Sequence, residues 1–158
     1  MVKKIILPVC GALAVLFSGC ATVAQISAKI SSPAAPSPPV VVGTAKLKGS
    51  EETSALFDNF TAFVVAVNGL PVTAGRTGWN TPVEISAGNN TLTVEFNRGN
   101  FVARTDLELT AKANANYELK FASDAKIFGQ NSYCDFWIVD LGTNQTVTPV
   151  RKVPVKKR

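Results

Sequence analysis

Apolar and polar residues alternate along several short stretches in the second half of the chain. In residues 101–110 the odd positions are mostly apolar and the even positions mostly polar, and residues 91–96 and 117–121 also alternate. Successive side chains of a β-strand point to opposite faces, so a period of two indicates one buried and one solvated face. The alternation therefore predicts three half-buried strands.

Continuous apolar runs predict further strands. Residues 62–67 are uniformly apolar, and residues 136–141 are apolar except for Asp140. Runs of this length suit strands that are covered on both faces. Residues 45–48 and 82–85 are shorter candidates for strands.

Turn-forming residues separate the predicted strands. Asn68 and Gly69 both tolerate positive φ and can close a hairpin, and residues 87–90, 97–100 and 141–144 are expected to serve likewise. The turn at 97–100 joins two strongly alternating stretches, which we expect to form an antiparallel pair. The predicted fold class is all-β: a single antiparallel β-sandwich of about seven or eight strands.

Shared parity on the alternating strands predicts the core of this sandwich. The expected core side chains are Phe101, Leu107, Leu109, Leu119 and Phe121. Tyr133 and Trp137 also share one face of a strand, and we expect core packing there in preference to a binding platform. Cys134 lies in an apolar run and is expected to be a small core residue in preference to a reactive thiol.

The first residues have the pattern of a secretory signal. Lys3 and Lys4 precede an uncharged apolar run over residues 5–17, which is too short to span a bilayer. Residues 1–19 are therefore expected to form a signal helix that is removed. The mature chain would begin at Cys20.

The stretch Leu16-Phe17-Ser18-Gly19-Cys20-Ala21 resembles the lipobox of bacterial lipoproteins. The resemblance implies diacylglycerol transfer to the Cys20 thiol and cleavage between Gly19 and Cys20. Phe17 stands where that family usually has leucine. Ala21, in place of aspartate, implies sorting to the outer membrane, on either its periplasmic or its surface face. The alternative is an ordinary secretory signal that ends near a cysteine.

Residues 20–42 are expected to form a tether. Four prolines fall between Ser31 and Pro39, a composition that favours an extended polyproline conformation and cannot pack a core. At roughly 3 Å per residue, the dozen or so residues from Ser31 would reach roughly 35 Å. We therefore predict a sandwich domain over residues 43–150, held off the membrane surface.

The formal net charge of +5 is concentrated at the carboxyl terminus. Five cations fall in residues 151–158, whereas the rest of the mature chain is close to neutral, so no nucleic-acid-binding face is expected. Pro149 and Pro154 lack amide donors, and we predict an unstructured basic tail. This tail would bind anionic envelope polymers, or would only confer solubility. Its cations are Arg151, Lys152, Lys156, Lys157 and Arg158.

The composition argues against catalysis. The chain has no histidine, which removes the commonest general base, the Ser-His and Cys-His couples and most zinc sites. No spacing of side chains suggests a metal, and no cofactor is expected. With Cys10 removed and Cys20 lipidated, Cys134 would be left alone, so no internal disulfide is predicted.

One aromatic loop is a candidate ligand site. Trp79 lies between Arg76 and Asn80 in a stretch of small and polar residues, where its ring could stack on a sugar. The alternative is that Trp79 folds back and plugs the end of the sandwich.

Residues 67–72 and 83–94 resemble parts of small bacterial envelope domains of the PEGA and transthyretin-like types. An Asn-Gly turn ends one strand, and Ala87-Gly88-Asn89-Asn90-Thr91-Leu92-Thr93-Val94 starts the next. Such domains are mostly structural or binding modules. The sequence thus predicts a non-catalytic outer-membrane lipoprotein that is a structural or binding accessory of the envelope, with another envelope protein or an anionic polymer as partner. The alternative is a carbohydrate-binding lipoprotein that uses the Trp79 loop.

Overall fold

The computed structural model describes residues 43–55, 58–124 and 132–158. The predicted signal helix, the cleavage site, the lipid attachment at Cys20 and the tether over residues 20–42 lie outside these ranges. Within them, the structure contains no helix long and apolar enough to cross a membrane.

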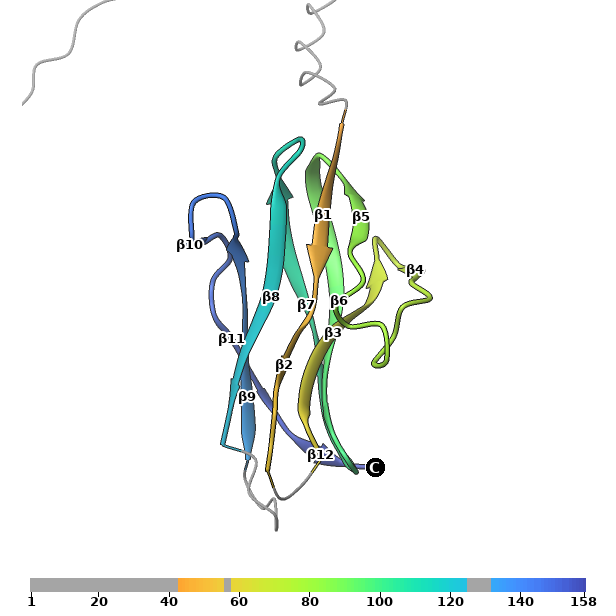
Figure 1. Cartoon of the computed structure of the whole chain (residues 1–158), viewed down its shortest axis with the longest axis vertical. Helices are drawn as coiled ribbons and strands as arrows, with labels where there is room; N and C mark the ends of the chain where they lie inside the picture. The colour runs from red at the N-terminus through yellow and green to blue at the C-terminus, as the bar shows by residue number, and fades with distance from the viewer. Residues whose placement is uncertain (1–42, 56–57, 125–131) are drawn as a thin grey trace, which may run out of the picture. The chain divides into compact units, whose positions relative to one another are not determined.

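The described residues form strands and no helix, which confirms the all-β prediction. Two six-stranded sheets pack against each other as a sandwich (Figure 1). In chain order the strands are β1 (Thr44–Lys48), β2 (Ser50–Glu52), β3 (Phe60–Val67), β4 (Leu70–Pro71), β5 (Val83–Ser86), β6 (Gly88–Arg98), β7 (Phe101–Ala111), β8 (Asn116–Ser123), β9 (Tyr133–Asp140), β10 (Gln145–Thr146), β11 (Arg151–Pro154) and β12 (Lys156–Lys157).

Sheet A has the order β10-β9-β8-β1-β5, with β11 also beside β9. Sheet B has the order β12-β7-β6-β3-β2, with β4 also beside β3. Neighbouring strands are antiparallel except for β1 and β8, which are parallel. The prediction of a wholly antiparallel sandwich is therefore wrong at this pairing, because β1 and β8 come together only after the chain has passed through sheet B.

The strongest sequence signals gave the local structure correctly. β6 and β7 form the expected antiparallel pair, and Gly99 at φ 53° lies in the turn between them. Asn68 and Gly69, at φ 51° and 79°, close the two-residue hairpin from β3 to β4. Residues 141–144 close the hairpin from β9 to β10, with Asn144 at φ 54°. These turns form because positive φ costs glycine nothing and asparagine little.

The turn expected at residues 87–90 does not close a hairpin. β5 pairs with β1 in sheet A, whereas β6 pairs with β3 and β7 in sheet B, so the chain changes sheets here. Gly88, at φ 101°, lies at this crossing. Gly49 lies at the crossing from β1 to β2, where a Cβ would collide with the Ala62 carbonyl oxygen.

The core lies between the sheets and is built from both. Phe96 of β6 is fully buried, with its ring centroid 5.4 Å from that of Phe121 on β8 and 6.1 Å from that of Phe60 on β3. Four of the five predicted core side chains are buried: Leu107, Leu109, Leu119 and Phe121. Phe101 is only half-buried, because it lies at the end of β7, where the inner face runs out.

The prediction of an unstructured tail over residues 151–158 is wrong. β11 pairs with β9, and β12 pairs with β7, so the last residues belong to both sheets. Val153 of β11 and Val155, which follows β11, pack against the core that lies between the two sheets. Pro154 fits because β11 is an edge strand, where a missing amide donor breaks no ladder.

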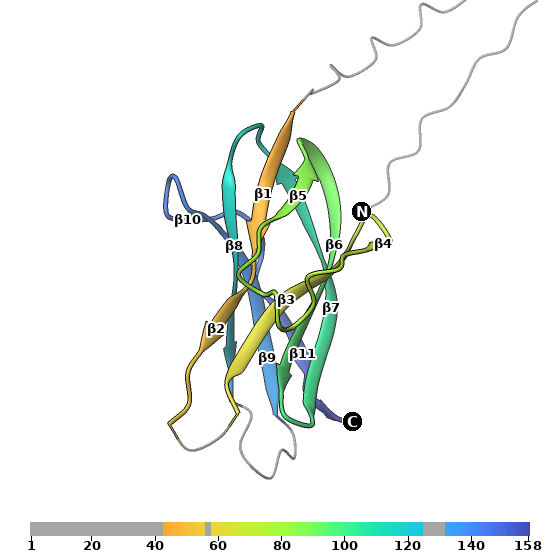
Figure 2. The same cartoon turned by 45° about the vertical axis from the view of Figure 1, so that its right-hand side comes forward.

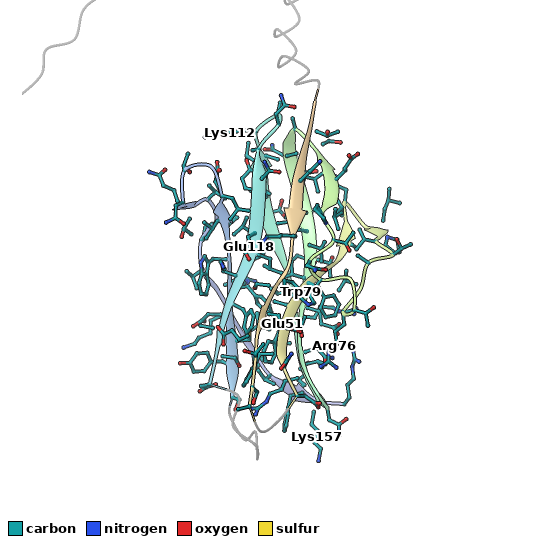
Figure 3. The ribbon with its side chains drawn as sticks, in the orientation of Figure 1. Glu51, Arg76, Trp79, Lys112, Glu118 and Lys157 are labelled. Carbon is teal, nitrogen blue, oxygen red and sulfur yellow. The ribbon has the colours of Figure 1, made fainter. Side chains whose placement is uncertain are left out.

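The start of β1 and the last strand lie at opposite ends of the sandwich (Figures 1 and 2). Figure 3 shows the same separation through Lys112 at one end and Lys157 at the other. The eleven residues of β6 run along this direction, and at about 3.3 Å per residue they span roughly 35 Å.

Candidate binding surfaces

The Trp79 loop lies against the outer side of sheet B. The Gly49 amide donates a 2.6 Å hydrogen bond to the Trp79 carbonyl oxygen, which fixes the loop beside the β1–β2 crossing. Trp79 and Phe63 line one small hollow that has no room for a water molecule, and Trp79 is half-buried. Phe63 on β3 is buried although it is on the outer side of sheet B.

Two backbone hydrogen bonds shape this loop. The Gly78 amide donates to the Ala74 carbonyl at 3.0 Å, and the Thr81 amide donates to the Gly78 carbonyl at 2.9 Å. The loop therefore folds back onto sheet B. The alternative prediction placed Trp79 at the end of the sandwich, whereas it lies near the middle (Figure 3). Arg76 and Asn80 remain exposed beside it.

Tyr133 and Trp137 lie on the outer face of sheet A. Cys134, Phe136 and Ile138 are fully buried, so the odd-numbered positions of β9 point away from the core. The prediction that Tyr133 and Trp137 pack in the core is wrong. Their shared parity was correct, but a period of two does not say which of the two faces is buried.

Cations lie beside both of these aromatic side chains. The Lys152 ammonium nitrogen is 3.6 Å from the centroid of the Tyr133 ring, a cation–π contact. Trp137 is half-buried and lies opposite Lys120 of β8 in the strand register. Tyr133 and Trp137 are four positions apart on β9, which places their Cα atoms roughly 13 Å apart. We call the surface formed by Tyr133, Trp137, Lys120 and Lys152 the aromatic face of sheet A. Its rings offer apolar surface and its ammonium groups offer hydrogen-bond donors, although the Lys120 ammonium is also paired with the Glu118 carboxylate at 2.8 Å.

The C-terminal cations do not form one cluster. The Arg158 guanidinium donates a 2.8 Å hydrogen bond to buried Glu95, which also pairs with Arg104 at 2.6 Å. Lys152 lies on Tyr133 in sheet A. Lys156 and Lys157 are exposed on β12 and make no ion pair with a described residue. Because β11 pairs with β9 and β12 pairs with β7, these charges are distributed over both sheets.

Cys134 is buried in the core, which confirms the prediction of a structural thiol. Burial raises the pKa of this thiol far above its usual value, and the negative charges of Asp135 and Glu52 raise it further. The reactive thiolate is therefore disfavoured in the folded state.

A groove separates β7 from the segment after β10. Its volume is about 230 Å³, and it is lined by Asp106, Leu107, Glu108, Thr148, Pro149, Val150 and Arg151. No local pattern in the sequence indicates this groove, because its second wall is formed by residues 148–151, where the domain was expected to end.

Within the described ranges, no group of three or more histidine, cysteine, aspartate or glutamate side chains is placed to hold a metal ion. Comparison of the chain with protein-family models, curated proteins and solved structures found no match.

Proposed function

We propose that this chain is a non-catalytic bacterial lipoprotein of the outer membrane, a structural or binding accessory of the cell envelope. In this proposal diacylglyceryl Cys20 is the membrane anchor. The order of features along the chain supports it: an apolar run, small residues and a cysteine, a proline-rich stretch, and then a strand that begins at Thr44.

One structural observation carries the accessory role. β1 begins at one end of the sandwich, and Lys156 and Lys157 lie at the other (Figures 1 and 3). A domain held by its amino-terminal end can present its opposite end about 35 Å further from the anchoring membrane. That arrangement suits contact with another component of the envelope.

Replacement of the anchor cysteine tests this proposal. We expect Cys20→Ser to remain unprocessed or to leave the membrane fraction, because a serine cannot accept the thioether-linked diacylglycerol. Membrane fractionation and mass spectrometry of the amino-terminal peptide measure both effects. Cys10→Ser is the matched control, since Cys10 precedes the cleavage site. An unmodified Cys20 in the membrane-bound protein would refute the anchor.

Glycan binding is the second candidate function, and the outward position of Tyr133 and Trp137 favours it. The aromatic face of sheet A then takes the role first assigned to the Trp79 loop, where the hollow beside the ring has no room for a ligand. Soluble peptidoglycan fragments and a glycan array are suitable probes. We expect Trp137→Ala to weaken binding at least about tenfold, the equivalent of 1.4 kcal/mol.

Trp79→Ala is the matched control and should retain binding, with folding of both variants checked by thermal melting. Loss of binding in Trp79→Ala alone would return the site to the loop. Absence of binding by the wild-type chain to every glycan would exclude this second function.

A further inference from the structure

β7 has a backbone edge that no described strand covers. Its inner edge pairs with β6 over all eleven residues, but β12 pairs only with Phe101 and Val102. The Arg158 amide donates to the Asn100 carbonyl at 2.8 Å, so even-numbered residues direct their backbone groups to the outer edge. Beyond β12, these groups belong to Arg104, Asp106, Glu108 and Thr110.

The groove described above runs beside this uncovered edge. Its apolar side is formed by Leu107, Pro149 and Val150, and Val150 is 60% exposed. Its acidic side is formed by Asp106 and Glu108, which lie on the outer side of sheet B.

Both carboxylates are held in place by β6. The Thr93 hydroxyl donates to the Asp106 carboxylate at 2.7 Å, and the Thr91 hydroxyl donates to the two oxygens of Glu108 at 3.0 and 3.1 Å. Neither carboxylate forms an ion pair with a described residue: Arg104 is paired with Glu95, and Arg151 lines the same groove without an ion pair to Asp106 or Glu108. The edge therefore presents two fixed carboxylates that form no ion pair with a described residue, with Arg151 as the cation that lines the same groove.

We propose that this groove binds an extended segment of another protein as an added strand on β7, with alternating apolar and basic side chains. Backbone pairing would use the free groups at Asp106 and Glu108. The basic side chains of the added strand would lie beside these carboxylates, on the outer side of sheet B. Its apolar side chains would alternate to the other side, toward Leu107 and Val150.

A second copy of the chain fits this edge poorly. The antiparallel register that uses residues 104–110 of both copies places Asp106 of each copy opposite Glu108 of the other. Like charges directly opposite one another destabilise a strand pair. The same charges that disfavour self-association would select a basic partner.

This inference deepens the accessory role and rests on it for the presence of a protein partner. Its test is separate, because peptide binding at β7 does not depend on the lipid at Cys20. The full-length chain in detergent is titrated with a synthetic peptide of ten alternating lysines and valines, and with a reference peptide of alternating glutamates and valines. We expect only the lysine peptide to bind.

Charge reversal locates the site. Glu108→Lys should weaken binding of the lysine peptide roughly tenfold, because it removes one favourable cross-strand pair and adds an unfavourable one. The matched control is Glu84→Lys on β5, the edge strand of sheet A, which should change affinity less than about twofold. Equal weakening by both variants would overturn the proposal, since it would indicate attraction to net charge alone.

Amide hydrogen exchange tests the strand pairing itself. Bound lysine peptide should slow exchange at Asp106, Glu108 and Thr110, whose amides face the open edge, by at least about tenfold. Unchanged exchange at these amides, or no binding of the lysine peptide up to about 1 mM, would overturn the proposal. Full binding of both peptides would do the same, because it would remove the charge selectivity.

Discussion

A chain that ends at Val150 is expected to lose at least about 3 kcal/mol of stability and to melt at least about 10 °C below the full-length protein. The truncation removes β11, which pairs with β9, and β12, which pairs with the first two residues of β7. It also removes Val153 and Val155, which are partly buried and pack against the core, and it removes Arg158, which pairs with Glu95. A small domain without a disulfide has only a narrow margin of stability to absorb these losses.

The control for this truncation separates strand pairing from charge. A full-length variant with Arg151, Lys152, Lys156 and Lys157 all changed to glutamine keeps both strands, because backbone pairing does not use these side chains. We expect it to melt within a few degrees of wild type, since exposed charges contribute little stability. Circular dichroism on heating measures all three chains. A truncated chain as stable as wild type would show that β11 and β12 contribute nothing to folding.

Phe96→Ala is expected to destabilise the domain by about 3–5 kcal/mol. Phe96 is 0% exposed and contacts Phe60 within sheet B and Phe121 across the sandwich. Replacing the Phe96 side chain with alanine leaves a cavity between the two sheets. The rings of Phe60 and Phe121 can fill it only by giving up their own packing contacts. Urea titration of the full-length chain gives the change in the free energy of unfolding.

Phe101→Ala removes the same atoms at a half-buried position and is the matched control. We expect it to cost no more than about 1.5 kcal/mol, because most of the removed surface is already accessible to water. Comparable losses in the two variants would mean that the inter-sheet aromatic contacts add nothing beyond the removal of a phenyl ring.

The local pattern of the sequence was sufficient for the hairpins and for most of the core. The pairing of β6 with β7 follows from two alternating stretches joined by a short turn, and all of the required contacts lie close together in sequence. Leu107, Leu109, Leu119 and Phe121 are buried as predicted, because large apolar side chains at alternate positions have one favourable face to occupy.

The surface sites were much less accessible from the sequence. Trp79 stood out because it is a tryptophan among small residues, yet its loop is fixed by a hydrogen bond to Gly49, thirty residues earlier. Tyr133 and Trp137 were assigned to the wrong face because Cys134, Phe136 and Ile138 are an equally apolar set of the opposite parity. The groove beside β7 needs two walls that are about forty residues apart, and nothing local links them.

What the sequence determined by itself is the all-β class, the main hairpins and the hydrophobic set that fills the core. These properties depend on side-chain alternation and on turn conformations, which act over a few residues. The tertiary structure alone decided where the chain changes sheets, which face of β9 is buried and how residues 151–158 are used. Each of these depends on a free strand edge or an apolar surface supplied by a distant segment. β11 and β12 form because β9 and β7 offer such edges, and neither contains enough apolar surface to be recognised as a strand on its own.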